Sequence, residues 1–371
     1  MQPKFLISGG GTGGHIFPAI AIADALKARY PDAHFLFVGA LGRMEMEKVP
    51  EAGYPIEGLW ISGLQRKLTL KNLSFPFKLL SSMLKAHKII RDFKPDVVIG
   101  TGGYASGPVL RAATSNHIPT LILEQNSYPG ITTKILAPKV NRICVAYEGM
   151  DKWLPISKIV TTGNPVRKEI QKLAEGADLK AKAIQHFSLS AEKKTILVIG
   201  GSLGARTINL SIEKGLKNIA DAGHQLLWQT GKLFFSQAKT DVETLNNPSI
   251  KAFAFIKEMD LAYSLADVVI SRAGAIAISE LCIAGKPSIL VPSPNVAEDH
   301  QTKNAKALAD KQAALMIRDV DAGQSLVDTA LELIHNTSRL QMLSGNILKL
   351  AKPSAITEIA NEITNLIPNK G

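Results

Sequence analysis

Residues 9–15 read GGGTGGH, a Gly-rich loop that ends in a histidine. The loop follows a strand-like run and precedes a helix-like run with Pro18 near its first turn. Its backbone N–H groups can therefore approach an anion at a helix N-terminus. An imidazole at such a junction changes its charge near neutral pH and can serve as a general base. His15 is thus the candidate catalytic base, and a capping or surface histidine is the alternative interpretation.

A second set of polar residues ends the apolar run TLILEQN, in which Glu124, Gln125 and Asn126 come last. Ligands of α/β proteins bind at the carboxyl ends of the strands, so these side chains are expected at a binding site. A carboxylate placed there can also accept a proton. Glu124 is the reserve candidate for the base.

The segment SRAGAIAISE carries Arg272 and Glu280 on either side of a Gly turn. An arginine can pair with a phosphate, and a glutamate can accept hydrogen bonds from both hydroxyls of a ribose. A structural salt bridge is the competing interpretation. The segment predicts either a nucleotide site or an ion pair.

These residues belong to a repeated pattern of an apolar strand, a Gly-rich turn and a helix. Copies of the pattern begin at Lys4, Asp96, Thr195 and Asp267. Strands that alternate with helices predict parallel sheets covered on both faces. The first and third copies look like the openings of two similar domains, and 371 residues suit two domains of roughly 150–200 residues. The pattern predicts a phosphate-handling α/β protein with two domains.

The turn signal GNP at residues 163–165 and the polar stretch after it suggest a domain boundary. We expect an N-terminal Rossmann-like domain over residues 1–163 and a C-terminal one over residues 164–352. No strand follows the helix predicted within residues 353–371. We expect that helix to pack back on the first domain.

The first Gly-rich loop also fits a dinucleotide-binding fingerprint, which makes an NAD oxidoreductase an alternative. The fingerprint needs an acid about 20 residues on, at the end of the second strand. That strand, HFLFVGAL at residues 34–41, ends without Asp or Glu. A Walker loop is disfavoured because His15, rather than a lysine, follows the last glycine.

The sequence offers little for a metal. Residues 319–321 read DVD, a nominal D-x-D, but they lie in a polar turn well past the Gly-rich loops. No Cys/His spacing suited to zinc is present in the sequence. We expect no protein metal site and no required cofactor, and stimulation by a divalent cation stays open.

The net charge of +11 is concentrated in part between residues 64 and 94, where Asp92 is the single acid. The basic residues there are Arg66, Lys67, Lys71, Lys78, Lys85, Lys88, Arg91 and Lys94. Apolar residues alternate with them, which favours docking on an anionic membrane leaflet, where each Lys or Arg contributes ~1 kcal/mol. A solvated helix face and nucleic-acid binding are the alternatives. No recognisable nucleic-acid motif supports the last one.

The apolar runs are strand-sized, and none approaches the ~18 residues that a membrane span needs. Met1 leads directly into a strand-like FLIS, so we expect no signal peptide. Cys144 and Cys282 lie within apolar segments and are expected to be buried thiols of a reduced compartment. We expect a cytoplasmic protein that attaches peripherally to a membrane surface.

An ordered set of motifs resembles the MurG family of N-acetylglucosaminyltransferases. The motifs are GGGTGGHIFPA, GGYASGP (102–108), LEQN (123–126), GNPVR (163–167), GGSLGA (200–205), SRAGAIAISE (271–280) and DHQTKNA (299–305). The resemblance covers essentially the whole chain. It implies the GT-B fold, in which two Rossmann-like, doubly wound parallel-sheet domains face an interdomain cleft and the donor nucleotide lies mainly in the C-terminal domain.

The resemblance also implies a donor site, formed mainly by the C-terminal domain. Ile256 would meet uracil through its backbone, with Met259 close by, and Glu280 would hold the ribose. The remaining implied donor contacts are Ala275, Ile276 and Ala277 for the diphosphate, Ser202 for a phosphate, Arg167, and Asn126 and Gln301 for the sugar hydroxyls. His300 beside Gln301 leaves an ambiguity of one residue.

In the N-terminal domain, the resemblance implies that Thr12, Gly13 and Gly14 close over the donor. The strand-to-helix turn formed by Gly102, Gly103 and Tyr104 is expected to cradle the diphosphate of the acceptor. These positions accompany His15 and Glu124 in the implied site.

The implied reaction moves N-acetylglucosamine from UDP-N-acetylglucosamine to the 4-hydroxyl of the N-acetylmuramic acid pentapeptide of lipid I, forming lipid II for peptidoglycan. A single displacement through an oxocarbenium-like transition state would invert the anomeric linkage. Helix N-termini can meet the charge of the leaving diphosphate. A UDP-N-acetylglucosamine 2-epimerase of the same fold is the alternative enzyme, and a UDP-sugar sensor or a scaffold of the wall machinery is the non-enzymatic one. Other cell-wall and division proteins are the implied partners, and the implied location is the cytoplasmic face of the inner membrane.

Overall fold

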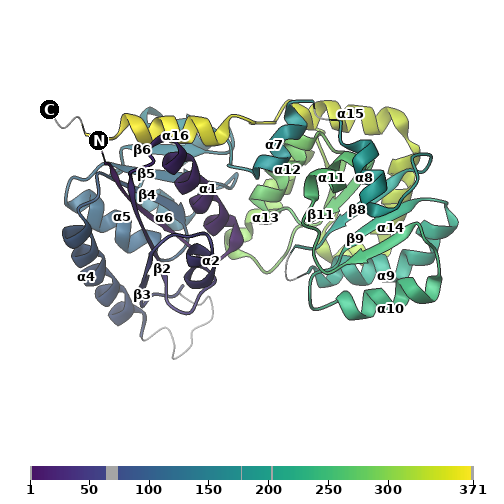
Figure 1. Cartoon of the computed structure of the whole chain (residues 1–371), viewed down its shortest axis with the longest axis horizontal. Coiled ribbons are helices and arrows are strands. Elements are labelled where there is room, and N and C mark those ends of the chain that lie inside the picture. Colours follow the sequence, from purple (N-terminus) through teal and green to yellow (C-terminus); the bar gives the residue numbers. More distant parts are fainter. Residues whose placement is uncertain (1, 64–73, 177, 202–203, 369–371) are drawn as a thin grey trace. The chain divides into compact units, whose positions relative to one another are not determined.

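The computed structural model describes residues 2–63, 74–176, 178–201 and 204–368. The chain forms two units, of which the first comprises Met1–Val166 together with Ser354–Gly371 and the second comprises Arg167–Pro353. Each unit contains one sheet with helices packed around it (Figure 1). The predicted pair of parallel-sheet domains is confirmed.

The sheet of the first unit has the strand order β3-β2-β1-β4-β5-β6-β7, and its neighbouring strands pair in parallel. The strands are β1 (Lys4–Gly9), β2 (His34–Ala40), β3 (Ile56–Leu59), β4 (Val97–Gly102), β5 (Thr120–Glu124), β6 (Arg142–Val145) and β7 (Ile159–Thr161). Phe5, Leu6 and Ile7 of β1 are fully buried, as expected for a central strand that is covered on both faces. The order reverses at β1, which creates the switch point where α/β proteins bind ligands.

Helices cover both faces of this sheet. They are α1 (Gly13–Arg29), α2 (Glu45–Glu51), α4 (Phe75–Phe93), α5 (Ser106–Ser115), α6 (Ile131–Leu136) and α16 (Ala355–Asn365), with short 3-10 turns η1 (Met150–Lys152) and η2 (Ile156–Lys158). The last helix, α16, lies beside α1 in Figure 1. Its Ile359 and Ile363, four residues apart on one helix face, are buried in the same core as Phe5. Arg29 of α1 donates to Asn361 of α16 at 2.8 Å.

The first unit extends past Gly163, because residues of this unit hold the next part of the chain. Asn164 donates from Nδ2 to the carbonyl of Gln125 at 3.0 Å, and Val166 is buried. The chain leaves the unit only at Arg167.

The sheet of the second unit has the order β10-β9-β8-β11-β12-β13, again with parallel pairs. The strands are β8 (Thr195–Ile199), β9 (Gln225–Gln229), β10 (Ile250–Phe253), β11 (Val268–Ser271), β12 (Ser288–Leu290) and β13 (Leu315–Met316). The neighbours of β8 match those of β1, because each lies between the strand that follows it and one from farther along the chain. The strand–turn–helix copies predicted at Thr195 and Asp267 are β8 and β11 with their helices.

The helices of the second unit pack around its sheet in the same way (Figure 1). They are α7 (Lys168–Ala174), α8 (Lys180–Phe187), α9 (Arg206–Asp221), α10 (Phe235–Leu245), α11 (Met259–Leu265), α12 (Ala275–Ala284), α13 (His300–Ala309), α14 (Ala322–His335) and α15 (Thr337–Leu348), with 3-10 turns η3 (Ala297–Asp299) and η4 (Asp319–Asp321).

Cys144 and Cys282 are buried free thiols, as predicted. Burial raises the pKa of each thiol to about 12, so both stay protonated near neutral pH. Among the helices that the structure describes, none combines the length and the apolar character that crossing a membrane requires.

Candidate active site

His15 lies in the first turn of α1, at the carboxyl edge of the first sheet. Its Nδ1 atom is 2.8 Å from the carbonyl oxygen of Thr101, and the Thr101 hydroxyl donates to the carbonyl of His15, also at 2.8 Å. A carbonyl oxygen only accepts hydrogen bonds, so Nδ1 of the neutral ring carries the hydrogen. The lone pair therefore resides on Nε2, the atom that can take up a proton.

The environment of His15 keeps the ring neutral. Burial is the largest influence and lowers the pKa of His15 below its ordinary value of 6.5. Four influences oppose this effect, in order of decreasing size: the Glu124 carboxylate, the bond to Thr101, the Gln125 side chain and the Glu45 carboxylate. Gln125 is itself buried and donates from Nε2 to the same Thr101 carbonyl at 2.6 Å. The imidazole is thus neutral at physiological pH and close to two carboxylates that favour its protonated form.

Glu124 ends β5 and is buried, but its carboxylate holds the loop that follows. Oε2 accepts from the Thr133 hydroxyl at 2.7 Å and from the Gly130 N–H at 3.0 Å, and Oε1 accepts from the backbone N–H and the side chain of Asn126 at 3.2 and 3.3 Å. Both oxygens of this carboxylate are thus engaged in holding the loop after β5. The geometry favours His15 over Glu124 as the base.

The turn after β4 packs directly on the loop after β1. Gly10 donates from its backbone N–H to the carbonyl of Gly102 at 3.2 Å. Gly102 and Gly103 have φ values of 100° and 85°, and a Cβ on Gly103 would overlap the carbonyl of Gly10. Both positions therefore require glycine. Tyr104 follows with an exposed side chain whose ring packs against Gly63.

Thr12, Gly13 and Gly14 form the entry to α1. The carbonyl of Thr12 accepts from the N–H groups of His15 and Ile16 at 3.1 and 3.2 Å. The first N–H groups of a helix have no partner within the helix, so those of Gly13 and Gly14 are suited to hydrogen-bond a ligand. Thr12 is exposed and both glycines are half-buried.

Glu45 is a residue of this edge that the sequence did not indicate. It is the first residue of α2, it is fully buried, and its carboxylate accepts from the backbone N–H of Gly11 at 2.8 Å. The signal that could have found it is the pair of glycines, Gly10 and Gly39, that make room for its side chain.

In the second unit, Glu280 on α12 forms a bidentate ion pair with Arg167. The two hydrogen bonds, from Nε to Oε1 and from Nη2 to Oε2, measure 2.7 and 2.8 Å. Tyr263 also donates to Glu280 Oε2 at 3.3 Å, and burial raises the pKa of that tyrosine well above its ordinary value. A salt bridge is therefore present at Glu280, and its partner is Arg167 rather than Arg272.

The start of α12 has the features of an anion site. Gly274 precedes the helix in an extended conformation, and the first helical backbone bond runs from Ile278 to Gly274 at 3.0 Å. The N–H groups of Ala275, Ile276 and Ala277 therefore come before the first helical bond and can face a ligand. These residues are half-buried.

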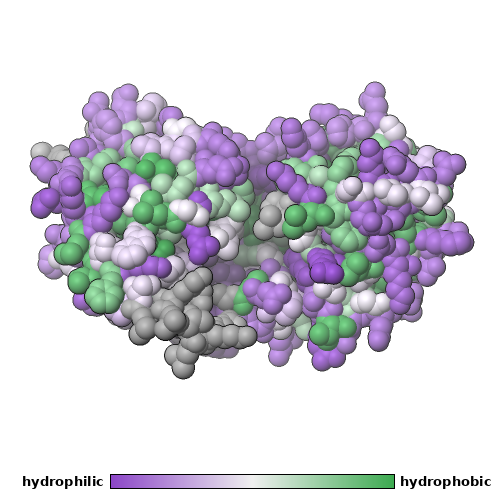
Figure 2. All heavy atoms as spheres, turned by 90° about the horizontal axis from the view of Figure 1, so that it is seen from below, coloured by the Kyte–Doolittle hydropathy of each residue, from purple (hydrophilic) through white to green (hydrophobic). Residues whose placement is uncertain are grey.

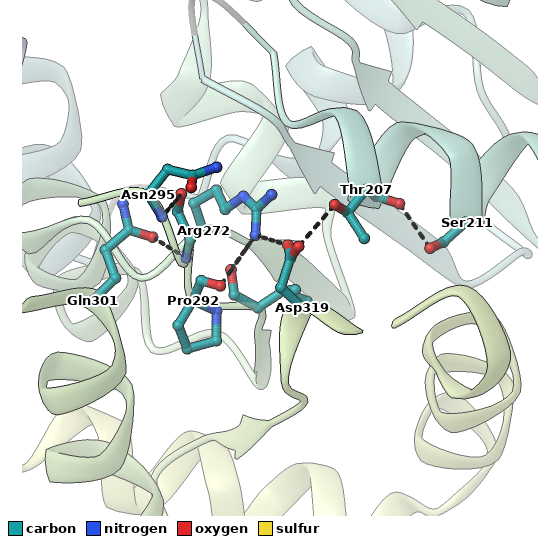
Figure 3. Close-up of polar contacts among 9 residues, drawn as sticks. Thr207, Ser211, Arg272, Pro292, Asn295, Gln301 and Asp319 are labelled. Atoms are coloured by element: carbon teal, nitrogen blue, oxygen red, sulfur yellow. Dashed lines mark hydrogen bonds and ion pairs between the residues drawn. The ribbon is translucent and has the colours of Figure 1, made fainter. Parts of the chain in front are cut away.

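Arg272 follows β11 and binds the segments that follow β12 and β13 in the second sheet (Figure 3). Its Nη1 donates to the carbonyls of Val291 and Pro292 at 3.0 and 3.2 Å and to Oδ1 of Asp319, and Oδ2 of Asp319 accepts from the Thr207 hydroxyl at 2.9 Å. Thr207 lies in the first turn of α9. Arg272 thus forms a structural salt bridge, the competing interpretation of the sequence, and its pairing with a phosphate stays a prediction.

The two acids of the DVD segment point to different partners. Asp319 binds Arg272 and Thr207, whereas Asp321 pairs with Arg318 at 2.6 Å. In the described part of the chain, no group of three or more His, Cys, Asp or Glu side chains is placed to hold a metal ion.

The other predicted donor contacts lie in different parts of the second unit, each with its own local contacts. The backbone N–H of Ile256 donates to Oε1 of Gln229 at 2.9 Å, so only its carbonyl is left for a base, and Met259 is buried nearby at the start of α11. Gln301 accepts from the Ser293 N–H at 2.8 Å (Figure 3). Ser202 lies outside the described residues.

Comparisons with known proteins identify relatives over the full length. Two family models match, the glycosyltransferase family 28 N-terminal domain over residues 5–145 and the glycosyltransferase family 28 C-terminal domain over residues 195–359. A protein of Cytophaga hutchinsonii is 57% identical over 367 residues, covering 98% of this chain and 97% of that protein. Its name is UDP-N-acetylglucosamine--N-acetylmuramyl-(pentapeptide) pyrophosphoryl-undecaprenol N-acetylglucosamine transferase.

Solved structures agree with the predicted fold. The crystal structure of Acinetobacter baumannii MurG matches with a TM-score of 0.78 and 27% identity, over 98% of this chain and 99% of that one. A UDP-GlcNAc 2-epimerase from Neisseria meningitidis, bound to UDP-GlcNAc, matches with a TM-score of 0.65 and 14% identity, over 98% of this chain and 100% of that one. At that identity the likeness shows a shared fold alone.

Proposed function

The chain belongs to glycosyltransferase family 28, and from this membership we propose that it transfers N-acetylglucosamine from UDP-N-acetylglucosamine to the N-acetylmuramic acid pentapeptide of lipid I, forming lipid II for peptidoglycan. The observation that carries the proposal is the relative with that activity in its name, 57% identical over 98% of this chain. The arrangement of polar groups at the two sheet edges supplies the chemistry that the reaction needs.

The first unit supplies the proton acceptor. The acceptor 4-hydroxyl attacks the anomeric carbon, and its proton passes to Nε2 of His15, the atom left with the lone pair by the bond from Nδ1 to Thr101. The Glu124 and Glu45 charges favour the imidazolium that forms. A general base at this position accounts for a rate gain of about 10²–10⁴-fold.

The second unit holds the donor in this proposal. The N–H groups at the start of α12 meet the diphosphate, whose negative charge grows as UDP leaves. Glu280 takes the ribose hydroxyls, which its ion pair with Arg167 orients it to do. The attack and the departure occur on opposite faces of the sugar, so the linkage inverts from α to β.

We extend the proposal to peripheral attachment on an anionic membrane surface through α4. The exposed residues Phe77, Leu80 and Leu84 recur at helical spacing along α4, and Lys88 continues the same stripe as an exposed basic residue. The surface of the first unit in Figure 2 shows apolar side chains among polar ones toward the end where Figure 1 places α4. Arg66, Lys67 and Lys71 of the predicted basic segment lie outside the described residues.

The function is tested by incubating radiolabelled UDP-N-acetylglucosamine with a short-chain lipid I analogue. We expect label in the lipid product and release of UDP in equal amounts. Label that appears only in free sugar, with UDP released in the absence of lipid, would instead identify an epimerase-like enzyme.

The membrane extension is tested by sedimentation with vesicles that contain anionic lipid. Retention is expected at low salt and should weaken as screening rises. Replacing Leu84→Ser and Lys88→Glu together should release the protein, whereas Lys214→Glu, an exposed lysine of α9, should not. Equal retention of all three proteins at every salt concentration would argue against α4 as the membrane contact.

A further inference from the structure

Glu45 is a buried carboxylate with backbone partners in two different loops. Its Oε2 accepts from the N–H of Gly11 at 2.8 Å, in the loop between β1 and α1. Its Oε1 accepts from the N–H of Ala40 at 2.9 Å, at the end of β2. One side chain therefore ties the loop before His15 to the neighbouring strand, and bonds of this charge-assisted kind are among the strongest that a protein makes.

The surrounding backbone leaves room for this carboxylate. A Cβ on Gly10 would overlap Oε1 of Glu45, and a Cβ on Gly39 would overlap its Cγ. Gly11 has a φ of 84°, a left-handed conformation that directs its N–H to the carboxylate. Gly10 is also bonded to the turn after β4 through the carbonyl of Gly102. Movement of Glu45 would thus shift the loop on which His15 is mounted.

We propose that Glu45 is a positioning residue for the transfer reaction, a built-in anion that fixes the Gly-rich loop and orients His15 toward the acceptor hydroxyl. The inference rests on the function proposed above. Because the carboxylate already holds the Gly11 N–H, the groups left to face a substrate are later ones in the loop, among them those of Gly13 and Gly14. The first unit thereby differs from a dinucleotide-binding loop, whose early N–H groups face a pyrophosphate.

Glu45 also contributes a negative charge close to the ring that must become positive. The groups whose charges or hydrogen bonds act on His15 are Glu124, Glu45, the Thr101 carbonyl and the Gln125 side chain, and all of them raise its pKa against the effect of burial. Removing the Glu45 charge should lower that pKa, and the acid limb of the rate profile should move to lower pH. The corresponding shift for Glu124→Gln should be larger, since the influence of Glu124 is the stronger.

The test compares Glu45→Gln, Glu45→Asp and the wild type in the lipid I transfer assay across pH. Glu45→Gln keeps the shape but has only one acceptor oxygen for two N–H groups, so kcat should fall about 10- to 100-fold, the size of effect that a small misplacement of a reacting group produces. The KM for the donor should stay within about two-fold, because most of the donor contacts are assigned to the second unit. Glu45→Asp keeps the charge but loses reach, so its kcat should fall while its acid limb stays in place.

Glu51→Gln is the matched control. Glu51 lies on the same helix with an exposed side chain that pairs with Lys48, and its replacement should leave kcat and the acid limb unchanged. UDP protection in thermal unfolding confirms for each variant that the second unit is intact.

The outcomes separate this inference from the proposed function. Wild-type protein that fails to transfer label contradicts the proposed function itself. Active wild type, with Glu45→Gln and Glu45→Asp both matching it in kcat and acid limb, overturns the positioning role alone. Variants that lose thermal stability yet keep kcat and the acid limb also overturn it, since they would show that Glu45 only supports the fold.

Discussion

The two units share a strand order around their first strands but anchor their sheet edges with side chains of opposite charge. In the first unit the anchor is a carboxylate, Glu45, which binds backbone N–H groups of the loops after β1 and β2. In the second unit the anchor is a guanidinium, Arg272, which binds backbone carbonyls after β12 and, through Asp319, the start of α9.

The difference shows how one topology serves two tasks. A buried anion beside His15 favours a positive charge on the ring, which suits proton uptake. In the second unit the guanidinium of Arg272 is engaged with the loops. The N-terminus of α12 is then the group that can attract a diphosphate. The strand order determines where the loops meet, and the charge of the anchor decides what each edge can do.

The largest effect is expected at His15. His15→Ala should lower kcat by about 10²-fold or more and abolish the acid limb of the rate profile. In the wild type the midpoint of this acid limb should lie below pH 6.5, because burial lowers the pKa of the imidazole. Glu124→Gln should retain the limb, shifted to lower pH, since the carboxylate raises that pKa. If His15→Ala showed the same rate profile as the wild type, the base would be Glu124 or solvent rather than His15.

The next effect is expected at the ion pair of the second unit. Glu280→Gln removes the charge that holds Arg167 and one of the two acceptor oxygens proposed for the ribose, so the Kd for UDP should rise about 10-fold or more. Tyr263→Phe, which removes a single hydrogen bond to the same carboxylate, should raise it less. Calorimetric titration with UDP measures both. A Kd for Glu280→Gln equal to that of the wild type would show that the carboxylate only supports the helix.

A smaller effect is expected in the stability of the second unit. The Arg272 and Asp319 side chains are 18% and 17% exposed, so Asp319→Asn should lower the free energy of unfolding by about 2 kcal/mol, the usual contribution of a hydrogen bond to a charged group. Asp321→Asn is the matched control within the same DVD segment, and it should be close to neutral because its pair with Arg318 is at the surface. Denaturant unfolding compares the two. Equal losses, or activity that depends on a cation and disappears in both variants, would favour a metal role for the segment.

The smallest effect is a pH dependence of stability at His224. Nε2 of His224 lies 3.1 Å from Nε2 of His335, and burial, followed by His335 and Lys194, lowers the pKa of His224, with Asp267 opposing. A histidine whose pKa is lower in the folded state stabilises the fold above its ordinary value of 6.5, and that contribution is lost as the pH falls. His335→Gln should reduce the loss between pH 7 and 5.5, because it removes one of the influences that lower the pKa of His224. If the free energy of unfolding of the wild type and of His335→Gln changed identically with pH, the histidine pair would not contribute to the pH dependence of stability.

Much of the fold could be predicted because its signals are local. Strand, Gly-rich turn and helix follow one another within about 20 residues in each copy, and the turns indicate the carboxyl edge without any knowledge of strand order. His15 and Glu124 were found by this route. Their placement at the edge of the first sheet follows from the positions of β1 and β5.

The contacts that the sequence did not indicate join residues far apart in the chain. Glu45 reaches Gly11, Arg272 reaches Asp319, and Gln229 reaches Ile256 only once the strands are in order. Helix α2 itself does not separate Glu45 from Glu47 or Glu51, because burial is a property of the packed sheet. Arg167 appeared as a donor contact, but its partner Glu280 was identified by the structure.

The central claim is that proton transfer belongs to the first unit and donor binding to the second. A crossed comparison of His15→Ala and Glu280→Gln tests it most directly, with kcat for lipid I at saturating donor and the Kd for UDP measured on each variant. The account predicts that His15→Ala loses kcat and keeps the UDP affinity of the wild type. It predicts that Glu280→Gln loses UDP affinity and, once saturated, retains most of its kcat. A loss of UDP affinity in His15→Ala, or equal losses of both quantities in the two variants, would contradict the division.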